Sequence, residues 1–160
     1  MSQTPAPDKA EIDAMMTRIG VRPRPPSVGL LEEVQRRWTL TQPFHNIDLL
    51  AGYGARTPPL DRHLGWRRCL SGLGGPCHVQ ASSLLFLLEG LGFDAHFSPA
   101  RITHPGDHLV VCAHVEDQSF ICDVGNGHPY LRPFAVDGEA SQNHLGGSLR
   151  SYGDGGSTRL

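Results

Sequence analysis

The stretch GGPCHVQASSLLFLLEGLGF, residues 74–93, decides the fold of this chain. It predicts a helix that begins beside Cys77, because Pro76 suits a first helical turn, where its missing N–H costs nothing. The apolar residues are dense enough for a buried helix, which Gly90 and Gly92 close; they are Leu84, Leu85, Leu87, Leu88 and Leu91. A cysteine therefore stands at the N-terminus of a buried helix, directly behind two glycines.

This position favours a reactive thiol. The helix dipole and the free N–H groups of the first turn favour thiolate over thiol, which lowers the cysteine pKa. The same N–H groups can hold the oxyanion that forms when an acyl carbonyl is attacked, and the preceding glycines let a substrate approach closely. The alternative is a structural cysteine that starts a helix by chance, since buried thiols are common.

The period of the apolar pattern changes after this helix. Strands are expected at 94–103, 108–115 and 119–124, and 131–136 is a candidate for a further strand. The residues from Leu109 to Val115 are apolar on both faces, as in a central strand. Glu116-Asp117-Gln118 is expected to form the turn of a hairpin.

The length of this turn decides whether a catalytic pair can form. A two- or four-residue turn pairs Val110 with Asp123, and His108 then lies on the same face of the sheet, diagonally across from Asp123. A three-residue turn places the two on opposite faces. A buried carboxylate needs a partner, and histidine is a good one. We therefore expect Cys77, His108 and Asp123 to act as nucleophile, base and orienting group. The alternative leaves Asp123 as a cap and His108 as one of nine histidines.

The N-terminal part of the chain predicts helices. After a disordered lead-in at 1–7, Asp8 is expected to cap a helix that Gly20 stops, and Ser27 to cap a second helix that ends before Pro43. The stretch 51–75 is interrupted by Gly and Pro, and we expect it to cross the molecule as an irregular segment. Residues 1–75 are thus predicted to form a helical domain and 76–136 a β-rich catalytic domain. The fold class is α+β, with the nucleophile helix packed on an antiparallel sheet or barrel, as in cysteine proteinases.

Composition excludes several classes of partner. The chain has 160 residues with 14 basic and 16 acidic side chains, a net charge of -2, so no strong field attracts nucleic acid or an anionic membrane. No apolar run approaches membrane-spanning length, and the N-terminus lacks the order of a signal peptide, so a cytoplasmic location is expected. The four cysteines should then be free thiols. Cys77-His78 and Cys112-x-His114 lack the paired spacing of zinc sites, so we expect no metal.

Five segments, in order along the chain, resemble motifs of the arylamine N-acetyltransferase family. They are Pro43–Asp48, similar to P-F-E-N-L-D; Gly74–Cys77, similar to R-G-G-x-C; Leu91–Phe93 and Ala100–Ile102, similar to L-G-F and A-R-V; His108–Val110, similar to H-L-V; and Asp123–Gly127, similar to D-V-G-F-G. The resemblance implies that Cys77 takes an acyl group from acetyl-CoA or another acyl thioester and passes it to an amine such as an arylamine. It implies no bound cofactor.

The same resemblance implies a third domain, of which 137–160 is the linker and the start. The chain stops near Leu160, where the family would begin this domain. It is therefore a fragment, or a short form that takes its acyl group differently, for which a carrier protein is a candidate donor, or a form whose lid comes from a second subunit. Phe44, Phe93 and Phe97 are candidates for an acceptor pocket, with core packing as the alternative for each. Gly125, Asn126 and Gly127 are further candidates for contact with substrate.

Several positions depart from the family pattern. Leu73 replaces an arginine, His45 a glutamate and Asn126 a phenylalanine, while His78, Val79 and Ala81 replace an aromatic residue, a glutamate and an asparagine. Two other classes therefore stay open. One is a transglutaminase-like or papain-like cysteine hydrolase, which uses the same order of residues. The other is a catalytically degenerate module that binds a ligand or partner through the same cleft.

Overall fold

The computed structural model describes residues 6–47, 50 and 61–136, together with the backbone of 139–144, 147–153 and 158–159. The expected lead-in at 1–5 and the crossing residues 51–60 lie outside the described residues. The helices are α1 (Lys9–Ile19), α2 (Val28–Thr41), α4 (Arg62–Ser71) and α5 (Cys77–Gly90). None of the helices in the described ranges is long and apolar enough to cross a membrane.

The first two helices begin where their capping residues stand. The Asp8 carboxylate accepts the Glu11 N–H, and the Glu11 side chain accepts the Asp8 N–H in return, which completes a capping box for α1. Ser27 caps α2 by accepting the Leu30 N–H. Both expected starts are therefore confirmed.

Helix α4 differs from the expectation of an irregular segment at 51–75. The Asp61 carboxylate accepts the N–H groups of His63 and Leu64, and the chain leaves the helix at Gly72, whose φ is +81°. Trp66 and Cys69 form the buried stripe of this helix. The capping residues Asp61 and Gly72 are both present in the sequence, but the many Gly and Pro residues before Asp61 favoured an irregular segment.

Two antiparallel sheets follow. The larger has the order β1 (Asp94–Arg101), β2 (Pro105–Val115), β3 (Gln118–Cys122) and β4 (Phe134–Ala135), and it is open, not closed into a barrel. The smaller has the order β5 (Glu139–His144), β6 (Gly147–Gly153) and β7 (Thr158–Arg159). This sheet forms in the part that was expected to be a linker and the start of a third domain.

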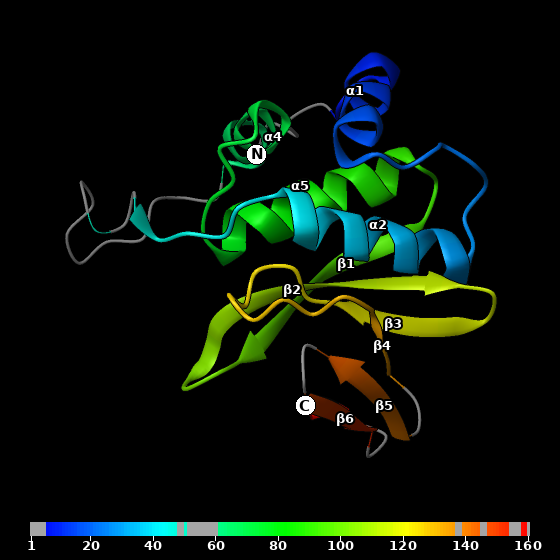
Figure 1. Cartoon of the computed structure of the whole chain (residues 1–160), viewed down its shortest axis with the longest axis vertical. Helices are drawn as coiled ribbons and strands as arrows, with labels where there is room; N and C mark the ends of the chain where they lie inside the picture. The colour runs from blue at the N-terminus through cyan, green and yellow to red at the C-terminus, as the bar shows by residue number, and fades with distance from the viewer. Residues whose placement is uncertain are drawn as a thin grey trace.

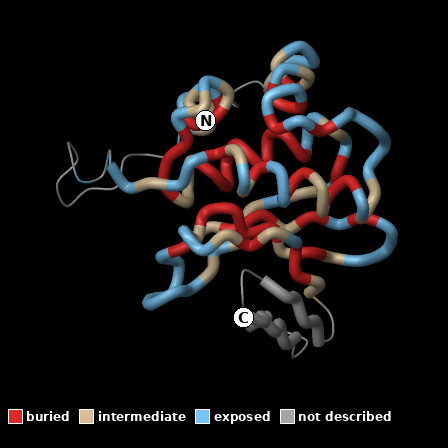
Figure 2. The backbone as a smooth tube through the Cα atoms, in the orientation of Figure 1, coloured by how far each residue is buried: buried red, intermediate tan, exposed pale blue. Residues whose placement is uncertain are grey.

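Helix α5 lies at the centre of the molecule, with α1 and α4 on one side of it and the larger sheet on the other (Figure 1). Buried residues gather along it and on the strands beneath it (Figure 2). From Gln80 to Leu88 every side chain of this helix is buried. The prediction of a nucleophile helix packed on an antiparallel sheet is confirmed.

The hairpin between β2 and β3 has a two-residue turn. Val115 pairs with Gln118, and Val111 pairs with Cys122. Glu116 and Asp117 both have positive φ, at 52° and 60°, which is the backbone of a type I′ turn. This register extends to Val110 opposite Asp123, and it places His108 and Asp123 on the same face.

Candidate active site

The loop before Cys77 is built from backbone contacts. Gly74 has φ +63°, and a Cβ there would lie 1.9 Å from the Pro43 carbonyl oxygen, so glycine is required. The Gly75 N–H donates to that same oxygen (3.2 Å), and the His45 N–H donates to the Gly75 carbonyl (3.3 Å). The motif segments 43–45 and 74–75, separated by about thirty positions, thus form one structure.

Side chains that the sequence did not single out support this loop. Gln80 is fully buried; its amide oxygen accepts the Trp38 Nε1–H (2.8 Å) and its amide nitrogen donates to the Pro43 carbonyl (2.8 Å). Arg68 of α4 donates from Nε to the Gly74 carbonyl (3.1 Å). The sequence does not mark this role of Gln80, because its partners Trp38 and Pro43 stand 42 and 37 positions away and meet it only in the folded chain.

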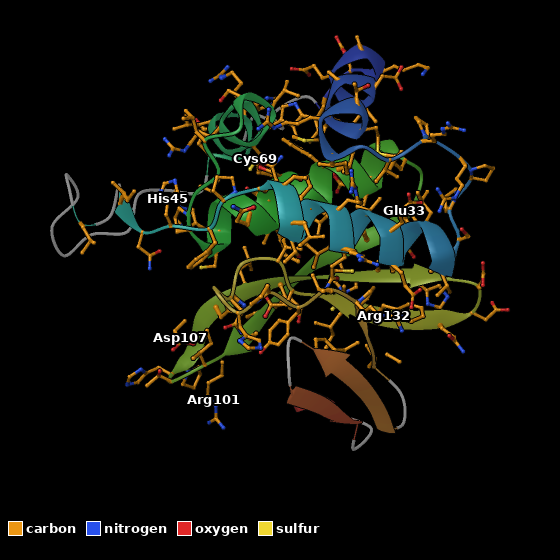
Figure 3. All side chains as sticks on the ribbon, in the orientation of Figure 1. Glu33, His45, Cys69, Arg101, Asp107 and Arg132 are labelled. Atoms are coloured by element: carbon orange, nitrogen blue, oxygen red, sulfur yellow. The ribbon has the colours of Figure 1, made fainter. Side chains whose placement is uncertain are left out.

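Two of the departures from the family pattern meet in space. His45 lies beside the loop that leads into α5 (Figure 3), and its Nε2 donates to the Leu73 carbonyl at 2.8 Å. The imidazole therefore links the two segments without the charged side chains that the family pattern places at these positions. The Leu73 side chain itself is exposed.

His108 and Asp123 form a buried pair. The distance from His108 Nε2 to Asp123 Oδ1 is 2.9 Å, and the two side chains are 3% and 2% exposed. Because Nε2 is engaged by the carboxylate, Nδ1 is the nitrogen that remains for the thiol. The three predicted residues are brought together, with Cys77 at the first position of α5.

The thiol and the imidazole shift each other's ionisation. Partial burial alone raises the pKa of Cys77, but hydrogen bonds and positive charge from His108 and His78 outweigh it and lower the pKa to about 6. Burial likewise disfavours the charged form of His108, but the hydrogen bonds and negative charges of Asp123 and Cys77 raise its pKa to about 9. Between these values the pair exists as thiolate and imidazolium.

The other three cysteines have the opposite shift. Burial raises the pKa of Cys69 to about 11, and it also raises the pKa values of Cys112 and Cys122. All four are free thiols. Only Cys77 combines partial exposure with a lowered pKa, which is the environment of a nucleophile.

The loop after Asp123 packs against Cys77. A Cβ at Gly125 would lie 2.7 Å from the Cys77 Cα, so this loop approaches the backbone of α5 as closely as glycine allows. A Cβ at Gly127 would likewise lie 3.0 Å from Cε1 of the Phe44 ring. Asn126 lies between them and donates to the Asp123 carboxylate. Phe44, which is 38% exposed, thus lies at the edge of the site.

Phe93 and Phe97 lie elsewhere. Phe93 is buried in the main core just beyond the C-terminal end of α5, and Phe97 packs on the same core. The Arg62 guanidinium lies 5.6 Å from the Phe97 ring and 3.8 Å from that of Phe86, near the C-terminal end of α5. Phe93 is therefore a core residue, and Phe97 packs on the core while it stays partly exposed; Phe44 is the phenylalanine that the structure places beside the loop 125–127.

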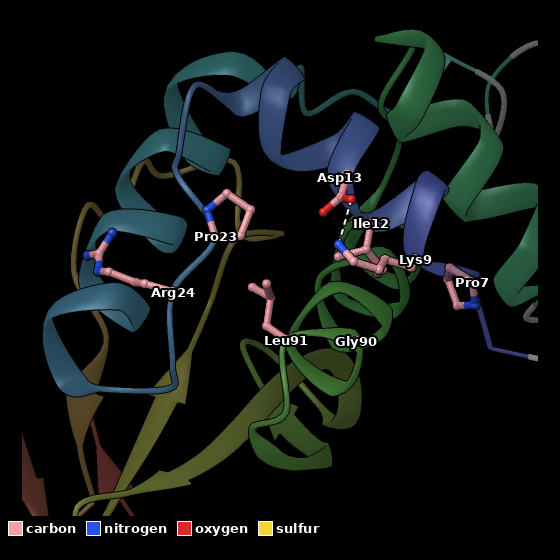
Figure 4. Close-up of a pocket in the computed structure, with 8 residues that line it drawn as sticks. All are labelled: Pro7, Lys9, Ile12, Asp13, Pro23, Arg24, Gly90 and Leu91. Carbon is pink, nitrogen blue, oxygen red and sulfur yellow. Dashed lines mark hydrogen bonds and ion pairs between the residues drawn. The ribbon is translucent and has the colours of Figure 1, made fainter.

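A surface cleft of about 520 Å³ lies at the far end of α5, lined in part by Gly90 and Leu91 (Figure 4). Its two cations are paired: Lys9 with Asp13, and Arg24 with Glu33. The cleft is separated from Cys77 by the length of the helix. Within the described residues, no group of three or more histidine, cysteine or acidic side chains is placed to hold a metal ion.

A family model described as N-acetyltransferase matches residues 27–159. The chain belongs to this family. Among curated proteins, none matches the sequence of this N-acetyltransferase family member.

Solved arylamine N-acetyltransferases share its fold. The enzyme from Mycobacterium abscessus is 23% identical with a TM-score of 0.75, over 92% of this chain and 55% of that one. The Salmonella typhimurium enzyme is 20% identical with a TM-score of 0.75, over 94% and 61%. A Bacillus cereus enzyme, described as having a unique Cys-His-Glu catalytic triad, is 15% identical with a TM-score of 0.74, over 94% and 62%. This family member thus spans little more than half the length of these structures, and the carboxylate that its His108 contacts is an aspartate, Asp123.

Proposed function

We propose that this chain is an acyltransferase that moves an acetyl group from acetyl-CoA, through a thioester on Cys77, to an amine such as an arylamine. The observation that supports it most is the Cys77 thiol at the N-terminus of α5, beside the buried pair of His108 and Asp123. A thiolate at neutral pH, an imidazole held in one tautomer and helix N–H groups for the oxyanion are the parts that acyl transfer needs.

In the first half-reaction the Cys77 thiolate attacks the carbonyl carbon of the donor thioester. The negative charge on the carbonyl oxygen is stabilised by the N–H groups of Cys77 and His78 at the start of α5, because those of Val79 and Gln80 already donate to the Pro76 carbonyl oxygen (3.0 Å each). The bond from the carbonyl carbon to the donor sulfur then breaks, and the leaving thiolate takes the proton of the His108 imidazolium. The products are a Cys77 thioester and the free thiol of the donor.

In the second half-reaction the amine nitrogen attacks the Cys77 thioester. His108, now neutral, takes the proton that the amine nitrogen loses. The bond from carbonyl carbon to Cys77 Sγ breaks as the amide forms, and the sulfur leaves as thiolate. The thiolate and imidazolium of the resting site are restored, so the cycle consumes no other reactant.

The acyl donor, the source of a lid and the cellular compartment are also proposed. A carrier protein that presents the acyl group as a thioester would serve the same first step, and a second subunit is a candidate source of a lid over Cys77. A reducing compartment such as the cytoplasm would keep all four cysteines as thiols. We propose no nucleic-acid or membrane partner.

Intact-mass spectrometry after incubation with acetyl-CoA tests the donor. We expect a gain of one acetyl group, its loss in Cys77→Ser, and its retention in Cys112→Ser, the matched control for a half-buried thiol of raised pKa. An acetyl gain that persists in Cys77→Ser would overturn the acyl-enzyme. No gain in a protein whose Cys77 alkylates rapidly would overturn acetyl-CoA as the donor.

Product analysis tests the acceptor. Adding an arylamine to the acetylated protein should release the acetyl group as the amide. Release as free acetate at the same rate with and without the amine would instead identify a hydrolase. An unreactive Cys77 with an ordinary thiol pKa would leave the degenerate binding module.

A further inference from the structure

Both oxygens of the Asp123 carboxylate are held. Oδ1 accepts the His108 Nε2–H (2.9 Å) and the Gly125 N–H (3.1 Å). Oδ2 accepts from Asn126 Nδ2 at 3.2 Å. The same amide nitrogen donates to the Tyr130 hydroxyl oxygen at 3.4 Å. Asn126 is therefore a direct neighbour of the group that orients the catalytic imidazole.

The orientation of the Asn126 amide follows from its neighbours. An ionised carboxylate only accepts hydrogen bonds, so the amide atom that faces Oδ2 has to be the nitrogen. This nitrogen has two hydrogens, and one is directed to Asp123 and the other to Tyr130. The carboxylate thus fixes the rotation of the amide, and the Tyr130 hydroxyl oxygen accepts the second hydrogen of the nitrogen.

Tyr130 is itself fixed by two other elements. Its carbonyl oxygen accepts the Gln35 Nε2–H (3.1 Å) and the Thr39 hydroxyl (3.2 Å), both from α2. Its ring packs edge-on against Phe134, with 5.2 Å between centroids and 83° between planes. A chain of contacts therefore runs from α2 through Tyr130 and Asn126 to the catalytic carboxylate.

We propose that Asn126, held by Tyr130, is a positioning residue that keeps the Asp123 carboxylate in the plane where Oδ1 meets His108. The torsion about the last bond of an aspartate side chain is broad, so a carboxylate held at one oxygen alone can rotate. Hydrogen bonds to a charged acceptor are the strong class, so the Asn126 contact is well suited to prevent this rotation. The inference rests on the proposed roles of Cys77, His108 and Asp123.

The test measures the pH dependence of iodoacetamide alkylation at Cys77 by mass spectrometry, which requires no acyl donor. Asn126→Leu keeps the branched shape of the side chain and removes the donor; we expect the titration of the thiol to move to higher pH and its rate at neutral pH to fall about tenfold. Tyr130→Phe, which keeps the ring packing, should shift the profile in the same direction by less.

The double variant separates positioning from packing. If Tyr130 acts through Asn126, then Asn126→Leu with Tyr130→Phe should alkylate no more slowly than Asn126→Leu alone. Additive losses, or a wild-type pH profile in Asn126→Leu, would overturn the inference. Thermal unfolding and the alkylation rate of Cys112 report whether each variant is folded, and Tyr130→Phe alone decides the matter if Asn126→Leu does not fold.

The outcomes also separate this inference from the proposed function. A shifted Cys77 profile in Asn126→Leu supports the positioning role even where acetyl-CoA acylates nothing. Acylation of the wild-type protein together with an unshifted profile in the variant leaves the function intact and removes the inference.

Discussion

The two ends of helix α5 differ in burial and in capping. At its C-terminal end Leu87 and Leu88 are fully buried, and Glu89 is paired with Arg62 at 2.8 Å. At its N-terminal end the cap residue is Pro76, which supplies no side-chain hydrogen bond, and Cys77 is half-exposed. The helix is anchored by apolar packing at one end, and this packing allows the other end to keep free N–H groups for chemistry.

Two glycines near Cys77 are needed because backbone lies directly against the first turn of α5. Gly75 and Gly125 bring backbone against the first turn of α5, and Gly125 is the closer, at 2.7 Å from the Cys77 Cα for an added Cβ. A side chain at Gly125 would collide with Cys77, and one at Gly75 would crowd the Val79 side chain. The C-terminal end of α5 is packed by large apolar side chains, whereas its first turn is packed by the backbone of glycines.

The largest effect is expected at the reactive end. His108→Gln removes the proton acceptor and the positive charge beside the thiol, so acyl transfer should fall by roughly 10^3 to 10^4. The stability of the fold should change little by comparison. Steady-state kinetics and thermal unfolding of the variant check both statements. Retention of most of the activity would show that His78, not His108, activates Cys77.

At the packed end the effect should fall on stability. Leu87→Ala leaves a cavity in the core, and we expect the free energy of unfolding to fall by about 3 kcal/mol. Chemical denaturation measures this loss. The pH profile of Cys77 alkylation should stay unchanged in the folded variant, and a shifted profile would mean that the two ends of the helix are coupled.

A smaller loss of activity is expected from Gly125→Ala. The added Cβ meets backbone atoms of Cys77, which cannot turn away as a flexible side chain can, so the nucleophile has to move. Acyl transfer should fall on the order of tenfold to a hundredfold. Gly29→Ala is the matched control, because Gly29 is an exposed residue of α2 with no atom within 4 Å of an added Cβ. Kinetics of the two variants should differ in this direction; equal activities would contradict the close contact.

The pH profile of activity tests the Cys77 end of α5 without any substitution. Activity should be lost as pH falls through about 6, where the Cys77 thiolate is protonated. It should also be lost as pH rises through about 9, where His108 no longer carries the proton for the leaving thiolate. The acidic limb should drop about tenfold per pH unit. A profile that rises only above pH 8 would indicate an ordinary thiol.

The parts of the fold that could be predicted are those governed by local rules. Asp8 and Ser27 mark the starts of α1 and α2 through capping, and the apolar run after Cys77 marks α5. Helix α4 was not predicted, although Asp61 and Gly72 mark its ends, because its apolar stripe is short. The roles of Gln80 and Asn126 were not visible, since a polar side chain shows its partner only after folding.

The amino-acid sequence by itself determined the helix that begins at Cys77 and the positions of the strands along the chain, and it named the three candidate residues of the site, because periodicity, caps and motif order are local properties of the chain. The tertiary structure decided whether those residues meet. Glu116 and Asp117 adopt positive φ in a two-residue type I′ turn, although Asn-Gly or Asp-Gly are the residue pairs that favour this turn. That turn sets the register that joins His108 to Asp123, and the packing of α5 on the sheet then brings Cys77 to the imidazole.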